Sequence, residues 1–123
     1  MPTFATVKNL DHSIEEPVRI RICDSYSSRL RGLMFRFAIA RDEGLLLVGN
    51  RDSRLDSAIH MLFVPFNLAA FWIDSGMEVV DKIIAKAWHP AYIPSRPARF
   101  VLEIHPDLYA AYEVGNKVEI IDA

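Results

Sequence analysis

The chain has 123 residues, of which 51% are hydrophobic and 24% charged. This balance is typical of one ordinary globular domain and excludes a disordered segment. The formal net charge of −2 at pH 7 argues against bulk electrostatic binding to nucleic acid or to an anionic membrane. The single cysteine, Cys23, excludes an internal disulfide, and no apolar run has the length of a signal-peptide core or a membrane span. We therefore expect a cytoplasmic protein with no nucleic-acid and no membrane partner.

Alternating apolar residues predict the first clear strand at residues 18–23, with residues 1–17 as an N-terminal arm or an extra strand. Asp24 or Ser25 offers an N-cap, and apolar residues then recur at helical spacing. A short helix is expected over about residues 25–34. After a turn at 41–44, residues 45–48 have the composition of a buried strand and residues 49–54 that of a polar loop.

The second half of the chain predicts four more strands, at residues 58–64, 68–73, 78–88 and 100–104. Pro65 separates the first two, and a hairpin turn at 74–77 joins the next pair. Three prolines make residues 89–97 an extended loop. Pro106 suits the first turn of a short helix that ends at Tyr112, and a last strand follows at residues 117–121.

Taken together, the pattern predicts a single domain over residues 1–123 that is mostly β (α+β). We expect about seven strands and two short helices, arranged as a small antiparallel barrel or curled sheet. Because the strands are close in sequence and joined by short loops, this arrangement is favoured over a βαβ fold.

Three segments, in this order along the chain, resemble a widespread prokaryotic family known as domain of unknown function 192. The opening segment has Arg29, Gly32-Leu33-Met34 and Arg36, followed by Glu43-Gly44-Leu45-Leu46. The central segment has Met61, Leu68, Phe71-Trp72-Ile73-Asp74 and Gly76-Met77-Glu78-Val79-Val80. The closing segment has Ala98-Arg99-Phe100-Val101-Leu102-Glu103 and Val114-Gly115-Asn116-Lys117-Val118. The resemblance covers roughly residues 18–121.

The chain departs from the family pattern at a few positions. Ala69 stands where the family usually has Asp, Asp107 where it usually has Gly, and His60-Met61 where a Trp-Met pair is common. The resemblance implies a compact, mostly β domain and no established activity. If the missing Asp is a functional group in the family, this member lacks it.

The arginines of the opening segment have two interpretations. Residues 28–41 contain Arg29, Arg31, Arg36 and Arg41 and no acid. Glu103 lies among apolar neighbours and needs a partner, because an unpaired buried charge costs several kcal/mol. We therefore predict a structural ion pair between Glu103 and Arg29, Arg31 or Arg36. The alternative is an anion site, since guanidinium groups capture carboxylate or phosphate in bidentate fashion.

A second candidate surface is the aromatic and proline-rich loop at residues 88–97. Rigid aromatic side chains beside arginine are typical of recognition surfaces, and equally of a loop packed across a barrel mouth. The candidate ligand-binding residues are Arg29, Arg36, Trp88, Tyr92 and Arg96.

No catalytic constellation is visible in the sequence. His60 is the one candidate catalytic base, although a lone histidine in an apolar run is more often a packed residue. The four histidines show no metal-ligand spacing, and Cys23 has no cysteine partner. We expect neither a metal nor a cofactor, and Cys23 is interpreted as a small buried residue.

These observations favour a small non-catalytic binding or interaction module. Its ligand would be a small anionic molecule or a peptide at the barrel mouth. The alternative is a hydrolase-like enzyme that uses His60 with a carboxylate such as Asp74 or Glu103. A third hypothesis is a purely structural or oligomeric partner domain. The partner is an unknown small molecule or protein, and we expect a monomer or a weak homodimer.

Overall fold

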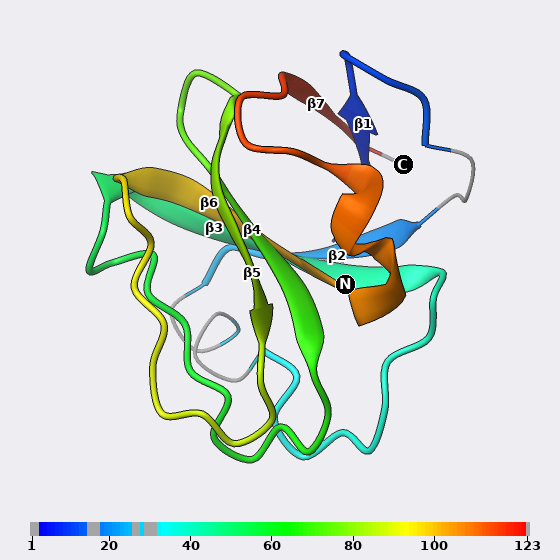
Figure 1. Ribbon diagram of the computed structural model, residues 1–123, viewed down its shortest axis with the longest axis vertical. Helices are drawn as coiled ribbons and strands as arrows, with labels where there is room; N and C mark the ends of the chain where they lie inside the picture. Colours follow the sequence, from blue (N-terminus) through cyan, green and yellow to red (C-terminus); the bar gives the residue numbers. More distant parts are fainter. Residues whose placement is uncertain (1–2, 15–17, 26–27, 29–31, 123) are drawn as a thin grey trace.

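The computed structural model describes residues 3–14, 18–25, 28 and 32–122. Over these residues the protein is mostly β, as the sequence predicts (Figure 1). The elements in chain order are β1 (Thr3–Asn9), β2 (Arg19–Cys23), β3 (Glu43–Ser53), β4 (Leu68–Ile73), β5 (Val79–Ala85), β6 (Ala98–Ile104), the 3-10 helix η1 (Pro106–Ala111) and β7 (Val118–Asp122).

The strands form one open sheet in the order β5-β4-β6-β3-β2-β1-β7. The sheet does not close into a barrel: near its two edges, the described residues form an isolated bridge between Glu78 and Lys117, with three backbone hydrogen bonds between residues 77–79 and 115–118, and no ladder between β5 and β7. All neighbouring strands are antiparallel except β2 and β3, which are parallel. The expectation of a wholly antiparallel sheet is wrong here, because the connection from β2 to β3 exceeds a dozen residues and allows a crossover.

Strand β6 lies between β3 and β4 and separates two apolar layers. One face of the sheet presents Val101 to a cover made by two separate segments, one containing Leu33 and the other Met61. The other face presents Leu102 to η1, where Leu108 and Tyr112 are buried. A strand covered on both faces has a nearly continuous apolar sequence, which is what residues 98–104 show.

The apolar run at residues 58–64, predicted as a strand, covers the sheet instead of joining it. Its backbone groups bond to the proline-rich loop: Ile59 exchanges two hydrogen bonds with Tyr92 (3.0 and 2.8 Å), and the Met61 N–H donates to the His89 carbonyl (2.8 Å). Alternation of apolar side chains indicates which residues are buried, but it does not distinguish a strand from an extended covering segment.

One other boundary differs from the sequence prediction. Strand β3 continues through Ser53, although residues 49–54 have a loop composition, because this end of the strand is largely exposed. Of the two alternatives predicted for the N-terminal residues, an arm or an extra strand, the structure has the strand, β1.

The two expected helices have different outcomes. Half of the first, residues 26–27 and 29–31, lies outside the described residues; at its start the Ser28 N–H donates to the Ser25 hydroxyl (3.2 Å), as an N-cap requires. The second forms, but as the 3-10 helix η1 with Pro106 in its first turn. Across the described parts of the chain, none of the helical structure is long and apolar enough to cross a membrane.

We predict that Gly44→Ala destabilises the fold by about 1–3 kcal/mol, because a methyl group there overpacks the core. A Cβ at Gly44 would lie 2.7 Å from Ile104 Cγ2 and 2.8 Å from the Glu103 carbonyl oxygen. Urea unfolding measures the effect. The control is Gly76→Ala in the exposed turn, where the nearest atom is Asp74 Oδ1 at 3.3 Å and a change within about 0.5 kcal/mol is expected. Equal effects of the two substitutions would contradict the close packing of β3 on β6.

Candidate functional site

A cavity of about 520 Å³ lies between the sheet and the segments that cover it. Its floor comes from β3, β4 and β6, and its walls from residues 32–34 and 55–64. The volume is within the range of small-molecule sites. The lining is apolar in part, with polar side chains contributed by Asn50, Arg51, Asp56, Ser57, His60, Arg99 and Glu103.

Glu103 is the most unusual residue of this cavity. Its side chain belongs to the central strand β6, opposite Leu45 on one side and Ala70 on the other, and the residue is 4% exposed. Among the described residues, no side chain or backbone group forms a hydrogen bond or ion pair with its carboxyl group. Burial raises the pKa of Glu103 to about 7, because desolvation disfavours the charged form. At neutral pH the carboxyl group is therefore able both to donate and to accept a hydrogen bond.

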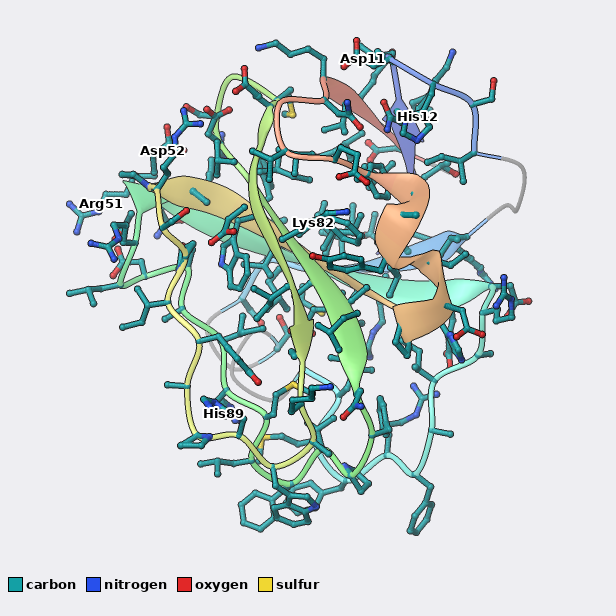
Figure 2. All side chains as sticks on the ribbon, in the orientation of Figure 1. Asp11, His12, Arg51, Asp52, Lys82 and His89 are labelled. Carbon is teal, nitrogen blue, oxygen red and sulfur yellow. The ribbon has the colours of Figure 1, made fainter. Side chains whose placement is uncertain are left out.

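Arg99 lies on the same face of β6 as Glu103. Its Nε–H donates to the Gly49 carbonyl at 3.0 Å, which fixes the guanidinium group at the edge of the cavity. No carboxylate pairs with Arg99 among the residues that the structure describes. Arg51, at the outer end of β3 (Figure 2), forms an ion pair with Asp56 at 3.2 Å and is mostly exposed. The cavity thus has a guanidinium group at its rim and a carboxyl group in its interior.

The wall opposite the sheet is held by hydrogen bonds to its backbone. The buried Trp72 indole N–H donates to the Ser57 carbonyl at 2.8 Å, and the Ser57 hydroxyl donates to the Ser53 carbonyl at 2.5 Å. The Leu62 N–H donates to His60 Nδ1 at 3.2 Å, so a neutral His60 carries its proton on Nε2. These contacts place His60 and Glu103 around the same cavity.

The predicted ion pair between Arg36 and Glu103 does not form. The Arg36 guanidinium instead donates to Glu43 Oε1 at 2.7 Å. The side chain of Arg36 is 47% exposed and that of Glu43 is 36% exposed. Arg29 and Arg31, the other two arginines of this prediction, lie outside the described residues. The sequence correctly places Glu103 among apolar neighbours. Arg36 pairs with Glu43 instead, because Glu43 is only seven residues away along the chain.

The other predicted ligand-binding residues do not line the cavity. Trp88 is 54% exposed and packs edge-on against Phe63. Tyr92 stacks on His89 at 4.1 Å, and its hydroxyl accepts a hydrogen bond from the Lys86 N–H. Arg96 lies 3.9 Å from Glu78. The proline-rich loop supports the cavity wall from behind, because Tyr92 is bonded to Ile59.

Cys23 and Asp74 are two further residues that the sequence analysis considers. Cys23 is buried, and burial is the main cause of its raised pKa, with the nearby Glu103 adding to the effect and Arg21 opposing it. Asp74 belongs to the turn before β5, where its carboxylate accepts a hydrogen bond from the Glu78 N–H. Across the described residues, no three histidine, cysteine or acidic side chains gather as metal ligands would.

Sequence reasoning missed Arg99 and Ser57 as cavity residues. The alternation of β6 does place Arg99 and Glu103 on one face, which is a usable signal. No sequence pattern indicates that Ser57 lines the cavity, because its position depends on how residues 55–64 fold over the sheet.

Comparison with known proteins gives a consistent assignment. The model of the DUF192 family, described as an uncharacterised ACR, matches residues 7–120. The chain is 30% identical to a UPF0127 protein of Pyrococcus furiosus over 90% of its own length and 94% of that protein. It is 29% identical to a UPF0127 protein of Thermococcus sibiricus over 82% of its own length, and it spans 65% of that relative.

The fold also has a solved counterpart. A protein of unknown function from Novosphingobium aromaticivorans superposes with a TM-score of 0.81, covering 96% of this chain and 84% of that one at 21% identity. At this identity the likeness is one of fold alone. With the family model matching nearly the whole chain, the sequence resemblance is confirmed: the protein belongs to the DUF192 family of uncharacterised proteins.

Proposed function

We propose that this protein binds a small organic molecule in the cavity between β6 and residues 55–64. The observation that carries the proposal is the buried Glu103 carboxyl group, which lines the cavity without a partner among the described residues. A buried polar group of this kind is costly to the fold unless it bonds to something else. Perturbed carboxyl groups in a cavity are also more common at functional sites than elsewhere.

Arg99 and Glu103 define which ligand suits the cavity. They are four residues apart on one face of a strand, which separates their Cα atoms by roughly 13 Å, with Val101 between them. A carboxylate or phosphate group would bond to the guanidinium of Arg99. A hydrogen-bond donor, such as an ammonium group, would reach Glu103, and the apolar body of the ligand would lie against Val101. The proposed ligand is thus still anionic, as the sequence predicts, but Arg99 binds its anionic group in place of Arg29 or Arg36. The ligand also carries a hydrogen-bond donor for Glu103.

A hydrolase-like function is the second candidate, because His60 and Glu103 line the same cavity. A carboxyl group with a pKa of about 7 is well matched to general acid–base chemistry at neutral pH. A nucleophile next to a base is not evident among the described cavity residues, so binding remains the favoured function. For the compartment, the single buried Cys23 fits the cytoplasm best.

We predict that an ω-amino acid of matching chain length binds more tightly than an alkyl amine or an alkyl carboxylate of the same length. Isothermal titration calorimetry with a series of increasing chain length measures this. Arg99→Gln and Glu103→Gln should each weaken binding by about tenfold or more, since each removes a hydrogen bond to a charged group.

Arg54→Gln is the matched control for Arg99. Arg54 is exposed and bonds to the Pro94 carbonyl at 2.9 Å, and its side chain does not line the cavity. This variant should bind like the wild type. The proposal fails if no compound of the series binds, or if the single-group compounds bind as well as the ω-amino acids.

We also predict that Glu103→Gln removes a pH dependence of stability. The pKa of Glu103 rises from 4.5 to about 7 on folding, so between these pH values the unfolded chain releases a proton that the folded chain retains. Wild-type stability therefore falls as the pH rises from about 4.5 to 7, by about 3 kcal/mol. Glu103→Gln should be nearly neutral at pH 5 and stabilising at pH 8.

Urea unfolding at these two pH values measures the effect, with the exposed Glu119→Gln as the matched control. The control should show no such dependence. If Glu103→Gln is destabilising at pH 8, the carboxylate has a partner within the protein and is not free for a ligand.

A further inference from the structure

A second pocket, of about 380 Å³, lies between strands β1 to β3 and residues 33–39, and its volume is within the range of small-molecule sites. Its base is apolar, because the buried side chains of Leu33, Ile39 and Leu45 line it. Of its described lining residues, only Leu33 also lines the cavity of Glu103. We call it the arginine pocket, after its three arginines, Arg19, Arg21 and Arg36.

The register of the sheet brings two of these arginines together. Arg19 and Arg21 are two residues apart on β2, so their side chains leave the same face of the sheet from Cα atoms roughly 7 Å apart. Arg21 lies opposite Phe4 of β1 on one side and Leu45 of β3 on the other. Directly opposite residues of neighbouring strands share a face, so both arginines lie on the face that residues 33–39 cover.

The guanidinium group of Arg19 is held by stacking. Its central carbon lies 3.7 Å from the centre of the Phe4 ring. Stacking engages the face of a guanidinium group and leaves the N–H donors, which lie in its plane, available to a partner. Within the described parts of the chain, no group accepts a hydrogen bond from the guanidinium of Arg19 or Arg21, and no carboxylate pairs with either. Two fork-shaped donors therefore line one pocket without a protein partner.

Two acidic residues also line the pocket. Glu43 Oε1 is engaged, because it accepts hydrogen bonds from Arg36 Nη2 at 2.7 Å and from the Ala40 N–H at 2.8 Å. Asp42 is exposed, and its carbonyl accepts a hydrogen bond from the Arg19 N–H at 2.8 Å. With three arginines against two acids, the described lining has a formal charge of +1, in a chain whose net charge is −2. The pocket is thus a positive site on an acidic protein.

We propose that the arginine pocket binds the phosphate group of a small phosphate monoester. A carboxylate has two oxygens in one plane, and a single guanidinium fork satisfies both. A phosphate group has three terminal oxygens that point in different directions, so two guanidinium groups can bond to it together. The exposed forks of Arg19 and Arg21 meet this requirement, and the apolar base of the pocket suits the organic part of the ligand.

The site differs from the anion site that the sequence offers as an alternative. Of the arginines in that prediction, Arg36 lines the pocket, whereas Arg29 and Arg31 lie outside the described residues. Arg19 and Arg21 come from the strand before them and join Arg36 only through the fold.

Isothermal titration calorimetry of the whole protein with inorganic phosphate, phenyl phosphate and benzoate tests the proposal. Phenyl phosphate should bind most tightly, because it has both the phosphate group and an apolar ring for the base of the pocket. Inorganic phosphate should bind several-fold more weakly. Benzoate should bind at least tenfold more weakly than phenyl phosphate, because its carboxylate engages only one fork.

Arg19→Gln and Arg21→Gln should each weaken the binding of phenyl phosphate by about tenfold or more, since each removes hydrogen bonds to a charged group. Both side chains are exposed, so both variants should fold, which circular dichroism checks. The matched control is Arg54→Gln, which changes an exposed arginine that lines neither pocket. This variant should bind phenyl phosphate like the wild type.

Three results would overturn the proposal. The first is that the wild type binds neither inorganic phosphate nor phenyl phosphate. The second is that benzoate binds as tightly as phenyl phosphate, which would remove the preference for phosphate. The third is that folded Arg19→Gln and Arg21→Gln bind phenyl phosphate like the wild type while Arg99→Gln does not, which would place the anion in the cavity of Glu103.

Discussion

The central strand β6 is the element on which the rest of the structure depends, because it is covered on both faces. Leu102 and Ile104 pack under η1, while Val101 and Glu103 face the covering segments at residues 32–34 and 55–64. A carboxyl group in the middle of such a strand is largely withdrawn from solvent, and this desolvation raises its pKa. The cavity beside it is open to a partner.

The cavity exists because residues 55–64 cover the sheet without joining it. A paired strand would have placed its side chains directly against those of the neighbouring strand and left little space. The covering segment is instead bonded to the proline-rich loop and held by the indole of Trp72. The apolar walls keep Glu103 desolvated, and Arg99 lines the same cavity at its rim.

The cavity and the packed rings of Phe35, Phe63 and Trp88 are distinct features built on one segment. Residues 58–64 provide the cavity wall through Met61 and the centre of the ring packing through Phe63. Both features carry free energy that the fold does not need: a buried carboxyl group without a partner among the described residues in one case, and exposed rings on a left-handed backbone in the other. Such local departures from what stability favours are most common at functional sites.

The sequence by itself determined the family, the mostly β class, the position of β4 and the two faces of β6, because apolar alternation and turn residues act over short distances. It also placed Glu103 among apolar neighbours. Only the tertiary structure decided that Arg36 pairs with Glu43, that β2 runs parallel to β3, and that residues 58–64 cover the sheet. Each of these depends on which distant segments meet, and pairing across a long connection has no local signal. The packing of Phe35, Phe63 and Trp88 is the clearest case, since these three residues become neighbours only when three loops fold onto one end of the sheet.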